Sequence, residues 1–138
     1  MPITVLGGTK LADTGYEVAN SCRFNDGDSP QLEMDMGDNP TLKTKYSFSC
    51  WIKPSTTGTN KCILGEGVGL TAQGDLRLMP DDNLAISERL ASEARYDITT
   101  TRVFRDVGAW YNIIWIFDST QSTAADRIKV YINGIRET

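Results

Sequence analysis

The chain of 138 residues is long enough for one domain with its own core, and its apolar content of 40% and charged content of 23% are typical of soluble globular proteins. A net charge of −4 argues against nonspecific binding to nucleic acid or to an anionic membrane surface, because both require a basic protein surface. The sequence has no histidine, which excludes histidine-based acid–base catalysis, and no apolar run reaches the ~20 residues of a membrane span.

A lead-in segment is predicted for residues 1–20, which hold one short apolar run among glycines and a proline. Such a segment serves as a linker, an edge strand or an arm that docks on another protein. It has no charged start followed by an apolar run, so we expect no secretory signal peptide. The remaining residues, 21–138, are predicted to form one domain.

The first clear strand pattern lies in "YSFSCWIKP", residues 46–54, where Phe48, Cys50 and Ile52 alternate with other residues. A period of two indicates a strand with one buried face. Trp51 is out of phase with these apolar residues, so we predict it on the opposite side of the strand.

The middle of the chain contains short apolar runs around Ile63, 76–78 and 84–86, separated by turns rich in glycine, aspartate and proline. Residues 86–96 are open to two predictions. A serine cap and several good helix formers favour a short helix, but the segment also suits a strand with an irregular loop. Residues 96–104 are rich in threonine and β-branched side chains and are predicted to form a strand.

The most apolar stretch is "WYNIIWIFD", residues 110–118, which carries apolar side chains on both faces, as central strands do. Residues 128–132 alternate again, with Tyr131 on the outward side. Asn133-Gly134 between two β-type runs predicts a two-residue hairpin turn of type I′.

Three cysteines are present, Cys22, Cys50 and Cys62. An odd number at scattered spacing argues against a disulfide framework. We expect buried free thiols, as in a protein made in a reducing cytosol. Without histidine or a Cys-x-x-Cys motif, no zinc site is expected.

Several short strands separated by turns predict an all-β fold, a two-sheet antiparallel jelly-roll sandwich. The first block that supports this prediction is "SCRFNDGDSPQLEMD" (21–35) followed by "YSFSCWIKP". The second is residues 98–138, which end in "RIKVYINGIRET". Both blocks resemble the laminin-G-like, concanavalin A-like jelly rolls of bacteriophage virion proteins, particularly tail and appendage proteins. Residues 58–96 carry little of this resemblance.

The resemblance implies a non-catalytic structural or adhesion module of a phage tail, neck or head appendage, with host-surface glycans as candidate ligands. It implies contacts with other virion proteins, assembly in the host cytoplasm and homo-oligomers, with a trimer as the first expectation. Residues 1–20 would then dock on the particle. The alternative is a soluble carbohydrate-binding or glucan-hydrolysing protein.

The C-terminal hairpin suggests a further expectation. Complete domains of this type continue for several strands after the Asn-Gly hairpin, whereas only four residues follow Gly134 here. The jelly roll is therefore expected to be incomplete at its C-terminus, either as a fragment of a longer protein or completed by strands of another chain.

Aromatic side chains on a sheet face can stack on sugar rings. Trp51 and Tyr131 are the candidates for carbohydrate contact, since each lies out of phase with the core residues of its strand. Trp110 and Trp115 are predicted in the core because the residues around them are apolar.

Acidic and amide residues in two turns suggest a calcium site. "FNDGDSP" and "MGDNP" hold the candidate ligands Asp26, Asp28, Asp38 and Asn39, whose oxygen atoms suit Ca²⁺. No complete calcium-binding loop is present, and the same residue types are common in ordinary turns. Both interpretations stay open.

One acidic motif raises the question of catalysis. "EMDMGD", residues 33–38, partly resembles the E-x-D-x-x-E strand motif of glucanases, which place two carboxylates on one face of a strand. Its last acid is Asp38 rather than glutamate, and it lies early in the domain. We therefore expect no enzymatic activity.

Overall fold

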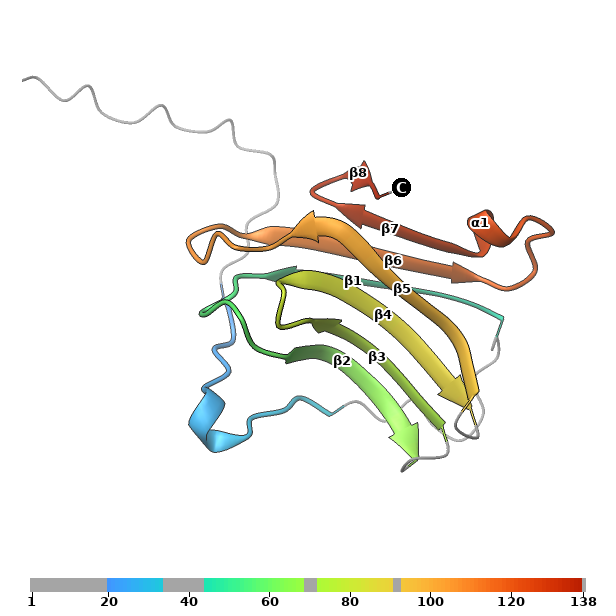
Figure 1. Cartoon of the computed structure of the whole chain (residues 1–138). Helices are drawn as coiled ribbons and strands as arrows, with labels where there is room; N and C mark the ends of the chain where they lie inside the picture. The colour runs from blue at the N-terminus through green and yellow to red at the C-terminus, as the bar shows by residue number, and fades with distance from the viewer. Residues whose placement is uncertain (1–19, 34–43, 69–71, 91–92, 138) are drawn as a thin grey trace, which may run out of the picture. The chain divides into compact units, whose positions relative to one another are not determined.

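The computed structural model describes residues 20–33, 44–68, 72–90 and 93–137. The chain divides into two units, Met1–Asn39 and Pro40–Thr138. In the first unit the described segment contains one short 3-10 helix, η1 (Asp26–Asp28). All the described strands lie in the second unit (Figure 1).

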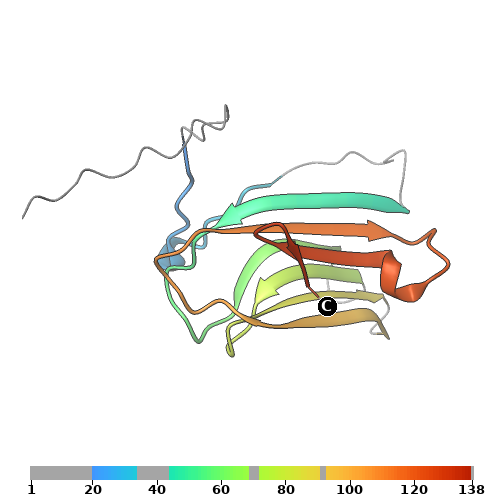
Figure 2. The same cartoon turned by 90° about the horizontal axis from the view of Figure 1, so that it is seen from above.

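The described strands form two antiparallel sheets of four strands each, which Figure 2 shows as two layers. Sheet A has the spatial order β1 (Lys45–Ile52), β6 (Tyr111–Asp118), β7 (Ile128–Ile132) and β8 (Ile135–Arg136). Sheet B has the order β2 (Lys61–Val68), β3 (Ala72–Leu78), β4 (Asn83–Leu90) and β5 (Glu93–Val103). A four-residue helix, α1 (Ala124–Arg127), precedes β7. The predicted all-β, two-sheet antiparallel sandwich is confirmed.

The core consists of the inward-facing side chains at alternate strand positions. Leu76 of β3 pairs with Ile86 of β4, and both are buried. From the other sheet, Ile113 and Trp115 of β6 belong to the same apolar cluster, as does Phe104 directly after β5. Full burial of one such aliphatic or aromatic side chain contributes about 1.5–3 kcal/mol, so this cluster is the main source of stability.

Strand β6 lies in the interior of sheet A, with β1 on one side and β7 on the other. Its odd-numbered residues include the fully buried Ile113 and share a face with the core. Ile114 and Ile116 lie on the outer face and are half-buried. The predicted central strand with two apolar faces is therefore confirmed.

Residues 86–96, for which the sequence also allows a short helix, form the end of β4 and the start of β5 on the described positions. Ile86 pairs with Ile98, and Glu88 pairs with Tyr96. The strand alternative is therefore confirmed for the described positions, and the helix alternative is wrong. Pairing with a neighbouring strand and burial of Ile86 outweigh a helix propensity that differs by at most about 0.7 kcal/mol between ordinary residues.

Two hairpin turns contain non-glycine residues with positive φ. Asn133 (φ 51°) and Gly134 (φ 80°) form the turn between β7 and β8, as the predicted type I′ turn requires. In the β3–β4 hairpin, Asp82 has φ 68°, and its N–H donates to the carbonyl of Met79 at 2.9 Å. Three-residue hairpin loops characteristically end in such a left-handed residue, usually glycine.

Candidate functional site

The two predicted carbohydrate-contact residues lie on the same face of sheet A, the side that points away from the core. Trp51 pairs with Asn112 of β6, and Tyr131 pairs with Ile114 of the same strand. Paired residues share a face, as do residues two apart along a strand. We call the surface formed by Trp51, Asn112, Ile114 and Tyr131 the sheet A platform.

The sheet A platform combines apolar surface with polar groups at its border. Trp51 is 58% exposed, and Tyr131 is half-buried. Arg136 pairs with Tyr131 on the side away from β6. Side-chain nitrogens of Lys129 and Arg136 lie 3.6 and 3.9 Å from one carboxylate oxygen of Asp126. Two cations share one anion here, which leaves a net positive border beside Tyr131.

Asp118 lies on the outer face of sheet A, at the end away from Trp51, and its carboxylate has several hydrogen-bond donors. It accepts hydrogen bonds from the hydroxyl and the N–H of Thr120 at 2.6 and 3.0 Å and from the Gln121 amide at 2.8 Å. The ammonium of Lys45 lies 3.1 Å away. The Thr120 hydroxyl, the Gln121 amide and Lys45 together hold the pKa of Asp118 well below its usual range.

The two other tryptophans differ in environment. Trp115 is buried, as predicted, with 4% of its surface exposed. Its ring nitrogen is the one buried side-chain N or O atom without a hydrogen-bond partner in the described part of the chain. Trp110 is 50% exposed, so the prediction of a core position is wrong. It lies just beyond the Ile52–Tyr111 pair, where the pairing of β1 with β6 ends.

A row of polar side chains on the outer face of sheet B was not predicted from the sequence. Asp75, Ser87 and Asp97 occupy paired positions on β3, β4 and β5. Ser87 Oγ donates to one oxygen of Asp75 at 2.9 Å, and an Arg77 guanidinium nitrogen donates to the other at 2.9 Å. The sequence signal that indicates this polar face is the alternation of Asp75 and Arg77 with leucine in "GDLRL".

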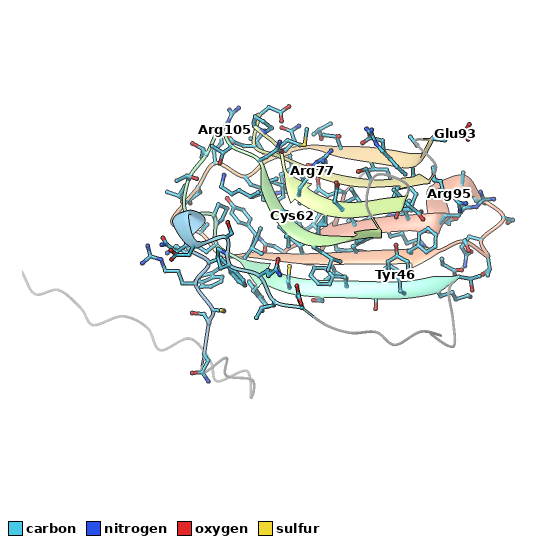
Figure 3. All side chains as sticks on the ribbon, turned by 90° about the horizontal axis from the view of Figure 1, so that it is seen from below. Tyr46, Cys62, Arg77, Glu93, Arg95 and Arg105 are labelled. Carbon is cyan, nitrogen blue, oxygen red and sulfur yellow. The ribbon has the colours of Figure 1, made fainter. Side chains whose placement is uncertain are left out.

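The three cysteines are free thiols, as predicted, but the expectation of burial is wrong for Cys22 and Cys62, which are exposed. Cys62 lies opposite Arg77, at a bulge of the edge strand β2, where it points to the outer face (Figure 3). Burial raises the pKa of Cys50 to about 11. Partial desolvation of the Cys62 thiol and the negative charge of Asp75 raise the pKa of Cys62, and Arg77 opposes this shift.

The predicted calcium ligands belong to the first unit. Asp28 is exposed, and its carboxylate accepts a hydrogen bond from the Asn25 amide at 2.8 Å, a contact common in turns. Asp26 lies in η1, whereas Asp38 and Asn39 fall outside the described residues. Among the residues that the structure describes, no group of three or more Cys, Asp or Glu side chains is placed to hold a metal ion. Calcium binding stays a prediction.

The acidic motif at 33–38 is described only at its first residue. Glu33 is exposed, and its carboxylate accepts a hydrogen bond from the Gln31 amide. Asp35 and Asp38 fall outside the described residues. The expected absence of catalysis therefore stays a prediction as well.

Comparison with known protein families agrees with the two-sheet architecture. Residues 26–138 match the model of a laminin G family that is described as the concanavalin A-like lectin/glucanases superfamily. The chain belongs to this superfamily. Comparisons with curated proteins and with solved structures find no match. Membership in the concanavalin A-like superfamily indicates a domain of carbohydrate-binding type and is compatible with both binding and hydrolysis.

This concanavalin A-like domain therefore offers two candidate sites, the sheet A platform and the polar row of sheet B. Among the described residues, the platform carries the exposed ring of Trp51, whereas Asp75 and Ser87 of the polar row are buried. A separate finding concerns the helices: those in the described ranges are too short to span a lipid bilayer.

Proposed function

We propose that this concanavalin A-like domain is a non-catalytic adhesion module of a phage particle, which binds host-surface carbohydrate through the sheet A platform. The observation that carries the binding proposal is the 58% exposed ring of Trp51 on a face shared with Tyr131. An exposed aromatic ring on a flat sheet contacts the C–H face of a sugar ring, while the rim of that sugar keeps its hydroxyl groups in water.

The spacing of the two aromatic residues suits an extended saccharide. Trp51 and Tyr131 lie two strands apart, with β6 between them. Their partners on β6, Asn112 and Ile114, are two residues apart along that strand. The strand spacing and the rise per residue give about 12 Å between their Cα atoms. The two rings would therefore contact different sugar residues of one chain. The positive border formed by Lys129 and Arg136 favours acidic saccharides over neutral ones.

A glycan array and titration calorimetry test the carbohydrate proposal. Trp51→Ala removes a stacking contact of about 0.5–1.5 kcal/mol and is expected to weaken binding roughly 2- to 10-fold, whereas Trp51→Phe should retain most of the affinity. Thr99→Ala, an exposed position on the outer face of sheet B, is the matched control. Equal binding by Trp51→Ala and the parent protein, or loss of binding only in Thr99→Ala, would contradict a site on sheet A.

The same array, repeated with and without a chelator, tests calcium as a proposed cofactor. Binding that depends on calcium should then be reduced by Asp28→Asn, because this change removes one of the acidic candidate ligands. Unchanged binding after chelation would remove calcium from the proposed mechanism and leave stacking as its basis.

The assignment to a phage particle is supported by the resemblance of residues 21–35, 46–54 and 98–138 to virion jelly rolls. Weak single contacts become strong when many copies bind one surface, which suits an adhesive appendage. Immunogold labelling of purified particles should decorate a tail, neck or head appendage. Label that stays with soluble host-cell proteins would refute the virion role and leave carbohydrate binding to be judged by the array.

A glucan hydrolase is the second candidate, and the polar row of sheet B is the observation that favours it. Asp75 and Asp97 lie on one face, two strands apart, which gives about 10 Å between their Cα atoms. Inverting hydrolysis uses carboxyl groups about 6.5–9.5 Å apart. Against it, Arg77 and Ser87 already occupy both oxygens of Asp75. Hydrolysis would be established if the parent protein releases reducing sugar from β-glucan and if Asp97→Asn or Glu33→Gln abolishes this release.

A further inference from the structure

Four aromatic side chains gather between the two sheets at the end of the sandwich where β1 begins and β6 ends. Tyr46 of β1 pairs with Phe117 of β6, and their stacked rings have centroids 4.9 Å apart. Trp115, two residues earlier on β6, meets the Tyr46 ring edge-on at 5.2 Å. From sheet B, the Tyr96 ring lies 6.0 Å from that of Phe117, and its hydroxyl lies 3.3 Å from that of Tyr46. We call these four residues the aromatic cluster.

A carboxylate, that of Glu88, lies beside the aromatic cluster. On β4 this residue follows the buried Leu84 and Ile86 at intervals of two, so it occupies the face directed to the core. Its partners on the neighbouring strands are Gly74 of β3 and Tyr96 of β5. Side chains directly opposite each other in an antiparallel pair are in contact range, so the Glu88 side chain lies next to that of Tyr96.

The Glu88 carboxylate has no positive partner in the described part of the chain. The residue is half-buried, yet it takes part in no ion pair with any residue that the structure describes. By contrast, Asp75 on the other face of sheet B is bound by Arg77 and Ser87. Removing a carboxylate from water is unfavourable unless a cation or hydrogen bonds compensate. Glu88 is therefore available to a positively charged ligand.

We propose that Glu88 and the aromatic cluster bind an organic cation with a quaternary ammonium group, such as choline. The faces of Trp, Tyr and Phe rings attract a cation that lies within about 6 Å of the ring centroid, and a carboxylate adds a full negative charge. The Tyr46 ring is 40% exposed, which gives a ligand access from solvent. This site lies on the inner face of the sheets. It is separate from the sheet A platform and does not depend on carbohydrate binding.

The chemistry of the cluster favours a quaternary ammonium group over other cations. A primary ammonium group carries three N–H donors and is strongly hydrated, and the faces of aromatic rings do not replace those hydrogen bonds. A calcium ion requires about six to eight oxygen ligands, whereas Glu88 supplies a single carboxylate. A quaternary ammonium group has no N–H donor, and its methyl groups can contact the rings directly.

A nuclear magnetic resonance titration of the full chain with choline tests the site. The indole N–H signal of Trp115 reports on the cluster because this ring contacts Tyr46. It is assigned by exclusion, since Trp51→Phe and Trp110→Phe each remove one of the other two indole signals. We expect choline to shift the Trp115 signal with a Kd of about 1–10 mM.

The neutral analogue of choline, in which a carbon atom replaces the nitrogen, is the matched control ligand. It has the same shape without the charge and should bind about tenfold more weakly. Equal binding of the two ligands would overturn the proposal, as would a choline titration that leaves the Trp115 signal unchanged or shifts only the Trp51 signal. This comparison uses the parent chain and holds even if a variant at the site fails to fold.

Two variants then separate the carboxylate from the rings. Glu88→Gln keeps the size of the side chain and removes its charge, so it should weaken choline binding about fivefold and leave binding of the neutral analogue unchanged. Phe117→Leu keeps an apolar side chain without a ring face and should weaken choline binding about threefold. Glu93→Gln, which removes an exposed carboxylate at the start of β5, should bind choline like the parent. Equal effects of Glu88→Gln and Glu93→Gln would indicate only long-range attraction and would overturn the role of Glu88.

Discussion

The side chain and the backbone of Asp82 connect three segments of the second unit. Its carboxylate accepts a hydrogen bond from the N–H of Gly58 at 2.7 Å and lies 3.3 Å from the guanidinium of Arg105. Its carbonyl accepts a bond from the N–H of Phe104 at 2.8 Å. Asp82 itself is buried and has φ 68°. Substitution at this position therefore tests whether the carboxylate or the left-handed backbone matters more.

The expected losses in the free energy of unfolding follow from these contacts. A hydrogen bond to a charged group contributes about 1.5–3 kcal/mol, which sets the main effect of losing the bond to Gly58. The ion pair with Arg105 contributes less, about 0–1 kcal/mol, because that side chain is 66% exposed. The left-handed conformation costs an alanine about 1–2 kcal/mol and costs glycine almost nothing.

We therefore expect a graded series of losses in the free energy of unfolding. Asp82→Asn keeps an oxygen acceptor and a residue type that tolerates positive φ, so it should lose about 1 kcal/mol. Asp82→Gly loses the carboxylate contacts without backbone strain, for roughly 2 kcal/mol. Asp82→Ala loses the carboxylate contacts and also strains the left-handed backbone, so it should lower the free energy of unfolding by roughly 3 kcal/mol. This is a large share of the roughly 5–15 kcal/mol typical of a whole domain.

Urea unfolding followed by tryptophan fluorescence measures these differences as shifts of the midpoint at constant slope. Asp81→Ala, an exposed aspartate in the same turn, is the control and should change the stability by less than about 0.5 kcal/mol. Equal losses for Asp82→Gly and Asp82→Ala would refute the role assigned to the left-handed backbone. A fully stable Asp82→Gly would refute the contribution of the carboxylate.

Two further predictions concern ionisable groups. The folded protein lowers the pKa of Asp118, so this carboxylate stabilises the fold above its unfolded pKa of about 4, and that stabilisation is lost as the pH falls through the lower folded value. The urea midpoint of Asp118→Asn should therefore be lower than that of the parent at neutral pH, and the two midpoints should converge on acidification. A difference between the midpoints that does not depend on pH would contradict a stabilising role of the ionised carboxylate. Iodoacetamide at neutral pH should modify the exposed Cys22 before Cys62 and should modify half-buried Cys50 last, as read by peptide mass spectrometry. Asp75→Asn should accelerate the reaction of Cys62 because it removes a negative charge, and an unchanged rate would argue against that influence.

Much of the fold and part of the candidate site follow from local patterns in the sequence. The period of two in residues 46–52 places Trp51 on the outward side, and the same argument places Tyr131 outward in β7. Apolar residues on both faces of β6 indicate a central strand. The type I′ turn at Asn133-Gly134 follows from the conformational freedom of these two residue types at positive φ.

Other features depend on partners that lie far away in the chain. A period of two tells which face a residue occupies, but it does not tell which strand lies beside it. The pairing of β1 with β6 decides that Trp51 and Tyr131 share one surface, and the order β3-β4-β5 brings Asp75, Ser87 and Asp97 into one row. The exposure of Trp110 depends on where the β1–β6 ladder ends.

The sequence by itself therefore determined the alternation of buried and exposed side chains, the all-β class and the Asn-Gly turn, because these depend on the geometry of a few neighbouring residues. The tertiary structure decided that residues 86–90 belong to a strand, that Asp82 binds Gly58, and that β1 lies beside β6 in sheet A. These features depend on contacts between segments distant in sequence, where strand pairing and burial of apolar surface outweigh local propensity.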